Sequence, residues 1–168
     1  MLLHALVEAA PVGTTIEIGS IKEIPLYDGD VEDASGLPRS VQLLKTKIAS
    51  CDGLLLVTPE YNNSIPGVFK NAIDWLTRPA GDIARVFGGR PVGLAGATPG
   101  PGATSMSQAS WLPVLRLLGT LPWFGGRLAI ANAGKVFDDQ GKLVDPVVRA
   151  QVEKYITGFS QFVAKHRA

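Results

Sequence analysis

Residues 52–76 read DGLLLVTPEYNNSIPGVFKNAIDWL and combine three patterns in an order that decides the fold. The run DGLLLV is typical of a short strand that is buried on both faces. A polar loop follows at 58–66, and apolar residues at helical spacing come directly after it. Open α/β sheets bind ligands at polar loops that leave the carboxyl ends of buried strands. We therefore expect a ligand site in this loop.

The same alternation of strand and helix patterns extends along the chain. The sequence predicts strands at 14–21, 52–57, 91–97 and 127–133, helices at 2–10, 41–51, 68–76, 105–119 and 148–163, and a loop at 25–38. Parallel neighbours need crossover connections of about this length. We therefore predict a doubly wound α/β fold with a parallel sheet in three α/β/α layers, formed by residues 1–168 as a single domain.

Composition and charge argue against several classes of function. Sixteen basic and fifteen acidic residues leave a formal charge of +1, so nucleic-acid binding is not expected. One cysteine, Cys51, cannot form an internal disulfide, and with two histidines it cannot make a usual Cys/His metal cluster. The apolar start MLLHALVEAA has no basic leader and is too short to span a bilayer. We expect a cytoplasmic protein without a membrane anchor.

Four segments together resemble the NADPH-dependent FMN reductase family, which includes flavodoxin-like quinone and chromate reductases. They are IPLYDGDVE at 24–32, TPEYNNSIPGVFKNAIDWLTRP at 58–79, GRPVGLAGATPGPGAT at 89–104 and FDDQGKLVD at 137–145. The similarity covers nearly the whole chain. It implies a flavodoxin-like enzyme that uses bound FMN to pass electrons from NADPH or NADH to a quinone, free flavin or another small acceptor by a ping-pong mechanism. It also implies a homodimer or a homotetramer.

The resemblance places the flavin between two loops. It implies that the ring and ribityl chain lie against Pro59, Glu60, Tyr61 and Asn62 in the first loop, and near Ala97, Thr98 and Pro99 in the second. The prolines would keep backbone amides aimed at one place, and the glycines of the second loop would let backbone approach a planar ring closely. No catalytic acid or base is expected, because the cofactor carries the redox chemistry.

Without the resemblance, both loops have simpler interpretations. The first is equally a helix-entry turn, with Asn63 or Ser64 capping and Pro66 in the first helical turn. The second is most simply a flexible connection. An alternative function follows, namely a flavodoxin-like scaffold without a cofactor that acts through oligomerisation or partner binding. A hydrolase is disfavoured, because the sequence has no G-x-S-x-G elbow and no partnered histidine.

The chain departs from the family pattern at two places. Family members carry a strand and a Ser/Arg/Asn-bearing phosphate loop ahead of the segment that matches 2–11. We expect this central strand and its loop to be missing here, which would leave strand edges unpaired and weaken FMN binding. Met106 stands where relatives often have an arginine, so the preference for NADPH or NADH stays open.

Several other residues receive structural interpretations. We expect Cys51 to be a small buried core residue, because it falls on the apolar stripe of its helix. The acidic cluster at 28–33 is expected to be a solvated surface loop, since its spacing is not that of a calcium loop. Trp75 and Trp111 are expected to pack or to lie at an interface, with the interface favoured.

Overall fold

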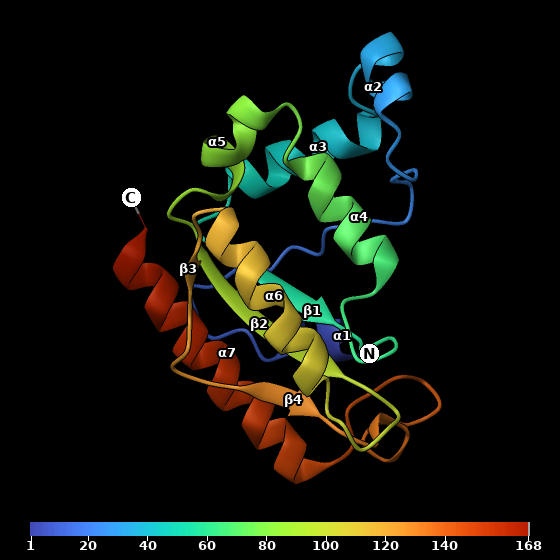
Figure 1. Cartoon of the computed structure of the whole chain (residues 1–168). Helices are drawn as coiled ribbons and strands as arrows, with labels where there is room; N and C mark the ends of the chain where they lie inside the picture. Colours follow the sequence, from blue (N-terminus) through green and yellow to red (C-terminus); the bar gives the residue numbers. More distant parts are fainter. Residues whose placement is uncertain (168) are drawn as a thin grey trace.

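The computed structural model describes residues 1–167 (Figure 1). Its helices are α1 Leu2–Glu8, α2 Gly29–Ser35, α3 Arg39–Ala49, α4 Gly67–Leu76, α5 Ile83–Phe87, α6 Ser105–Leu117 and α7 Pro146–His166. Its strands are β1 Leu54–Thr58, β2 Pro91–Ala97, β3 Leu121–Pro122 and β4 Leu128–Ile130, and two short 3-10 helices lie at Ala80–Asp82 and Ala133–Lys135.

The strands form one parallel sheet with β2 at its centre. β1 pairs with one edge of β2 in a register that runs from Leu54 opposite Val92 to Thr58 opposite Gly96. Two short strands share the other edge, with β3 beside 91–92 and β4 beside 95–97. Every pair is parallel, and the connections from β1 to β2 and from β2 to β3 contain helices, so the predicted α/β class with a parallel sheet is confirmed.

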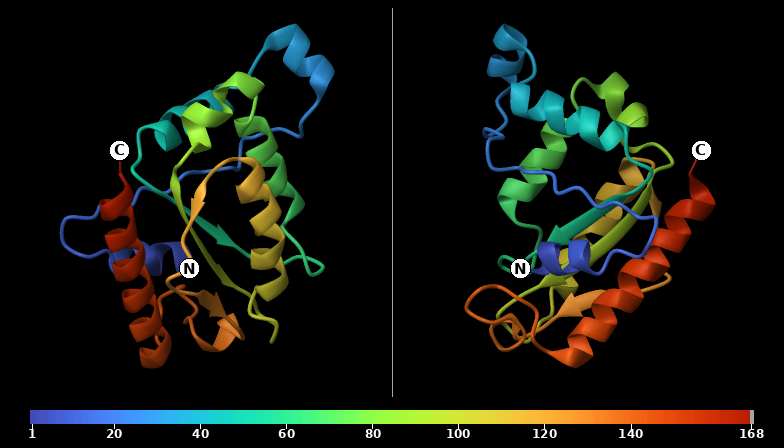
Figure 2. Two further views of the ribbon diagram at one scale, coloured as in Figure 1. Left: turned by 60° about the vertical axis from the view of Figure 1, so that its left-hand side comes forward. Right: turned by 180° about the vertical axis from the view of Figure 1, so that it is seen from behind.

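Helices cover both faces of the sheet (Figure 2). Along β2, Val92 and Leu94 pack into a core with α3, α4, α5 and α6, whereas Ala95 packs into a second core with α1 and α7. Successive side chains of a strand point to opposite faces, so a strand between two helical layers must be apolar at every position. This requirement explains the uninterrupted apolar runs at 52–57 and 91–97.

The C-terminal helix α7 has the clearest local start of any helix predicted from the sequence. Asp145 caps it, because its Oδ1 accepts hydrogen bonds from the backbone N–H of Val147 (2.8 Å) and Val148 (2.9 Å). Pro146 occupies the first turn, where a missing N–H costs nothing. Across residues 1–167, neither α7 nor any other helix has both the length and the apolar character required to cross a bilayer.

The strand predicted at 14–21 is wrong. Residues 14–20 run as irregular chain and pair with no strand within the described residues. Side chains hold this segment instead: the Thr14 hydroxyl contacts that of Ser160 on α7, and Glu17 pairs with Lys47 on α3 at 2.9 Å. A β pattern gives a strand only where another strand offers backbone partners, and the local sequence does not report whether one lies alongside.

The loop predicted at 25–38 contains a helix. Asp28 caps α2 through its Oδ1, which accepts from the backbone N–H of Asp30 at 2.9 Å. Glu32 binds the Arg78 guanidinium at 2.8 Å, and this hydrogen bond holds the pKa of Glu32 below its usual value. Nowhere in residues 1–167 do three or more potential metal-ligating side chains converge. Within the acidic cluster, Asp28 thus caps a short helix and Glu32 pairs with Arg78.

The interface expected at the two tryptophans is also wrong. Trp75 and Trp111 are fully buried in the core between the sheet and α3–α6, and the Trp75 indole N–H donates to the Pro25 carbonyl at 2.9 Å. The Trp75 ring packs edge-on against Tyr27 and the Trp111 ring against Phe69 of α4, so both indoles lie inside the chain and leave no exposed surface for a partner. Cys51 lies just beyond the end of α3 and is half-buried rather than part of the core, with its thiol donating to the Lys47 carbonyl.

Tyr155 on α7 completes the hydrogen bonding of β2. Leu94 lies between residues 91–92 of β2, which pair with β3, and residues 95–97, which pair with β4. The Tyr155 hydroxyl donates to the Leu94 carbonyl at 2.7 Å. Gly93 makes this approach possible, because a Cβ there would lie 3.0 Å from the hydroxyl oxygen. Burial raises the pKa of Tyr155, which favours the neutral hydroxyl that donates this hydrogen bond.

We predict that Tyr155→Phe lowers the free energy of unfolding by about 1–3 kcal/mol, because the partly buried Leu94 carbonyl loses its donor. Tyr27→Phe is the matched control, since it removes an exposed hydroxyl that binds Glu32. We expect the control to cost less than about 0.5 kcal/mol. Urea denaturation checks both, and equal losses in the two variants would show that Leu94 does not depend on Tyr155.

Candidate functional site

Three loops follow β1, β2 and β4 at the carboxyl edge of the sheet, at 59–66, 98–104 and 131–135. Among residues 1–167, five non-glycine residues have left-handed backbone, and all five lie in these loops: Asn62, Asn63, Ala103, Thr104 and Asn132. A residue with a side chain costs about 1–2 kcal/mol in this conformation unless it is asparagine or aspartate. Ala103 and Thr104 bear this cost, and such strain gathers where a ligand site requires a fixed backbone. The loops at this edge are therefore the candidate site.

The first loop contains a tight hairpin. Tyr61 and Ser64 exchange two backbone hydrogen bonds (3.2 and 3.0 Å), and Asn62 and Asn63 between them have φ values of 50° and 59°. Two successive positive φ angles define a type I′ turn, which favours asparagine and glycine. The turn displays the Tyr61 side chain, which is 58% exposed.

Asn63 and Ser64 do not cap the helix that follows. α4 begins after Pro66, and no side-chain hydrogen bond caps it within the described chain. The interpretation of this loop as a capped helix entry is therefore wrong. The two asparagines shape the hairpin instead, and the adjacent pair in the sequence was the pattern that could have revealed it.

The second loop packs directly on the ends of β1 and β2. A Cβ on Gly96 would lie 2.3 Å from the Thr104 Oγ1 and 2.5 Å from the Thr58 carbonyl oxygen, so only glycine fits there. Beneath the loop, the hydroxyls of Thr58 and Ser107 are 3.0 Å apart and both residues are buried. Thr58, Thr104 and Ser107 thus form a buried polar cluster under the site. Sequence reasoning missed Thr104 and Ser107.

Glu60 joins the first loop to the helix that follows the second. Its Oε2 accepts from the backbone N–H groups of Met106 (2.9 Å) and Ser107 (3.0 Å), at the start of α6. The carboxylate of Glu60 therefore points to the end of a helix rather than to solvent.

The second and third loops are joined by their backbones. The N–H of Thr98 donates to the Ile130 carbonyl and the Thr98 carbonyl accepts from Ala133, both at 3.0 Å. Asn132 donates to the Gly100 carbonyl at 3.1 Å. All three loops therefore form one connected surface above the ends of β1, β2 and β4.

The structure brings the predicted site residues to one edge of the sheet. Because β1 and β2 are adjacent and parallel, Pro59, Glu60, Tyr61 and Asn62 after β1 and Ala97, Thr98 and Pro99 at the end of β2 share this edge. The side chains of Tyr61, Asn62 and Thr98 make no hydrogen bond with any other residue of 1–167, so their polar groups are available to a ligand. We call the exposed surface of 59–62 and 97–99 the loop shelf.

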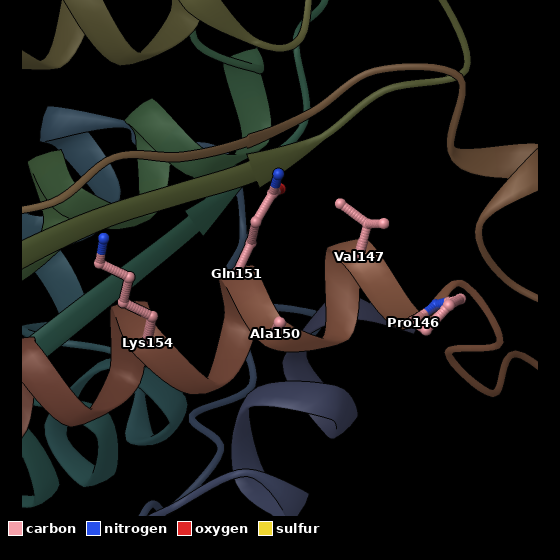
Figure 3. Close-up of a pocket in the computed structure, with 5 residues that line it drawn as sticks. All are labelled: Pro146, Val147, Ala150, Gln151 and Lys154. Atoms are coloured by element: carbon pink, nitrogen blue, oxygen red, sulfur yellow. The ribbon is translucent and has the colours of Figure 1, made fainter.

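Surface depressions lie elsewhere. One of about 480 Å³ is lined by Pro146, Val147, Ala150, Gln151 and Lys154. Figure 3 shows these residues on the single helix α7, with Val147, Gln151 and Lys154 projecting from the same side. A second, of about 710 Å³, is lined by four residues of α6. Neither combines groups from several elements, as a specific ligand site does, whereas the loop shelf does.

Comparison with known proteins identifies relatives along the whole chain. A sequence model of NADPH-dependent FMN reductases matches residues 1–135. An NAD(P)H-dependent FMN reductase of Pseudomonas aeruginosa is 35% identical over 165 residues, which cover 98% of this chain and 87% of the relative. A 2-hydroxy-1,4-benzoquinone reductase of a Burkholderia species is 33% identical over 166 residues, covering 99% and 88%.

A solved structure is similar over nearly the same length. FerB, a flavoenzyme NAD(P)H:(acceptor) oxidoreductase from Paracoccus denitrificans, has a TM-score of 0.87 at 29% identity. The match covers 99% of this chain and 90% of that one. The parallel sheet with its flanking helices is therefore the fold of a known flavoenzyme.

We predict that Asn62→Ala lowers the free energy of unfolding by about 1 kcal/mol, whereas Asn62→Gly leaves it nearly unchanged. Both variants remove the same amide, but only alanine is strained at a φ of 50°. Thermal and urea unfolding of the two variants side by side measure the difference. Equal stabilities would show that the turn at 62–63 does not have the left-handed conformation.

Proposed function

The chain belongs to the NADPH-dependent FMN reductase family, and we propose that its loop shelf holds FMN through which electrons pass from NAD(P)H to quinones or other small acceptors. The observation that carries this assignment is the set of free polar groups on the loops with left-handed backbone at the carboxyl edge of the sheet. The alternative of a scaffold without a cofactor is not favoured, because the sequence relatives with this family's motifs are named as reductases.

The residues of the loop shelf fit the ring and ribityl portions of FMN. A flavin presents carbonyls, ring nitrogens and hydroxyls, which need directed donors and acceptors. The Asn62 amide supplies both, the Thr98 hydroxyl supplies both, and the Tyr61 ring offers an apolar face beside its phenolic group. These three side chains are exposed or half-buried and have no competing hydrogen bonds within residues 1–167. We therefore propose Pro59, Tyr61, Asn62, Ala97, Thr98 and Pro99 as cofactor contacts.

When bound, FMN supplies the electron-transfer chemistry, and the residues of this chain supply position and electrostatics. Glu60 is the one carboxylate in the three loops, and its charge is directed at the start of α6. The turn at 62–63 and the close packing at Gly96 hold the loops in place before a ligand arrives. A preformed site loses little conformational entropy on binding, which favours affinity.

The exposure of the loop shelf to solvent affects which electron acceptors can bind there. Tyr61, Asn62 and Pro99 are all exposed, so nothing in 59–62 or 97–99 encloses a bound ligand on its outer side. A nicotinamide and then a small planar acceptor could therefore use the same exposed surface in turn. We propose quinones as acceptors, because two of the relatives are named a benzoquinone reductase and a quinone reductase.

We also propose that the chain assembles as a homodimer or a homotetramer through α6. Its outer side exposes Leu112 and Leu117, which is 83% exposed, around the depression of about 710 Å³ that Pro113 and Arg116 also line. Burying apolar area stabilises an interface by roughly 25 cal/mol per Å². A second copy of the chain is the partner that the family resemblance implies.

We predict that the FMN-loaded protein is reduced by NADH or NADPH under anaerobic conditions and is reoxidised by a simple quinone. Stopped-flow bleaching of the flavin absorption band measures the first half-reaction, and its recovery measures the second. Tyr61→Ala and Asn62→Gly should retain FMN less well, because each removes a free group of the loop shelf.

Cys51→Ser is the control for these variants. Its side chain lies beyond α3, away from the three loops, and a serine hydroxyl can also donate to the Lys47 carbonyl. We expect unchanged FMN content and turnover in this variant. A site elsewhere would be indicated if Cys51→Ser lost activity while Tyr61→Ala and Asn62→Gly behaved as wild type.

We predict that Leu117→Glu shifts the assembled protein toward monomer, because it places a charge in the proposed interface. Leu43→Glu is the matched control, since Leu43 is 62% exposed on α3, outside that surface. Light scattering coupled to size-exclusion chromatography measures both masses. A wild-type monomer, or an effect of Leu43→Glu alone, would argue against assembly through α6.

A further inference from the structure

The N-terminus of α6 has no cap of its own. Thr104 occupies the cap position in a left-handed conformation and makes no capping side-chain bond within the described chain. Its hydroxyl instead accepts from the Gln108 amide at 3.1 Å. The first N–H groups of a helix have no intrahelical partner, so their donors must be satisfied from elsewhere.

Glu60 provides this cap from a different loop. The N–H groups that it binds, those of Met106 and Ser107, are the second and third of the helix, which a usual cap residue would satisfy. One atom, Oε2, accepts both bonds. A carboxylate also interacts favourably with the positive end of the helix dipole. Glu60 is 46 positions before Met106, so this cap is a tertiary contact between two functional loops.

The first turn of α6 is also fixed on its other side. Arg127 donates to the Ser105 hydroxyl at 2.6 Å, and the Gln108 amide donates to the Leu128 carbonyl at 3.0 Å. The start of α6 is therefore tied to the chain around β4. Glu60 connects this fixed point to the loop after β1, because the next residues are Tyr61 and Asn62.

We propose that Glu60 is a positioning residue that sets the distance between the two halves of the loop shelf and so controls FMN affinity without touching FMN. The proposal rests on the proposed function, because it takes the loop shelf as the FMN site. It reassigns Glu60 from a cofactor contact to the cap of α6. It also means that the N–H groups of Met106 and Ser107 are not available to a phosphate of FMN or of the nicotinamide nucleotide.

Three variants test this role. Glu60→Ala removes the cap, Glu60→Gln keeps a carbonyl oxygen that can accept both hydrogen bonds, and Asp145→Ala removes a chemically similar cap from α7. FMN affinity is measured by quenching of flavin fluorescence. Hydrogen exchange at the amides of Met106 and Ser107 is measured without FMN, so that the state of the cap is known independently of the cofactor.

We expect Glu60→Ala to weaken FMN binding by about tenfold and to speed exchange at both amides. Glu60→Gln should restore slow exchange and bind FMN within about threefold of wild type. Asp145→Ala should lower the free energy of unfolding by about as much as Glu60→Ala does, but it should leave FMN affinity unchanged. Rescue by glutamine separates a positioning role from a direct charge effect on the cofactor.

Two results would overturn the role of Glu60 alone. One is faster exchange in Glu60→Ala with unchanged FMN affinity, which would show that the cap and the site are independent. The other is weak binding by Glu60→Gln with both amides still protected, which would show that the charge itself contacts FMN. A wild-type chain that takes up no FMN would instead overturn the proposed function, and this role of Glu60 would fall with it.

Discussion

The position of β2 is the constraint on which the rest of the structure depends. It is hydrogen-bonded on both edges, to β1 on one side and to β3 and β4 on the other, and helices pack on both of its faces. A strand in this position must be apolar throughout and must have small residues where neighbours approach closely. Gly93 admits Tyr155 and Gly96 admits Thr104, so the two glycines decide how close α7 and the start of α6 lie to the sheet.

The close approach of Thr104 to Gly96 connects the packing of the sheet to the loops of the candidate site. Because Thr104 packs against the ends of β1 and β2, the loop at 98–104 lies directly on the sheet, and α6 begins beside the loop that follows β1. Glu60 lies close enough to cap α6, and backbone hydrogen bonds join the loop at 98–104 to the loop after β4. Three loops from separate parts of the chain therefore behave as one preformed surface. Such a surface suits a cofactor that carries the redox chemistry itself and needs the protein to hold it in a fixed position rather than to supply acid or base groups.

The sequence predicted those features that depend on local pattern. The strands at 52–57 and 91–97 and the helices at 68–76 and 148–163 follow from periodicity, and the loops of the candidate site follow from their place after buried strands. The features that depend on distant partners were not predictable. Residues 14–21 have the pattern of a strand, but within residues 1–167 no strand lies beside them. Trp75 and Trp111 could be placed in the core only once the orientation of α4 and α6 was known. The cap that Glu60 gives to α6 joins residues 46 positions apart, which no local spacing indicates.

Hydrogen exchange with and without FMN measures whether one connected surface at the carboxyl edge of the sheet binds the flavin. We expect FMN to slow exchange in 59–64 and 98–104 together, because the loops form a single site. Exchange along 146–154 of α7, where an apolar depression also lies, should not change. Protection on α7 with none in the two loops would show that the flavin does not bind at the carboxyl edge of the sheet.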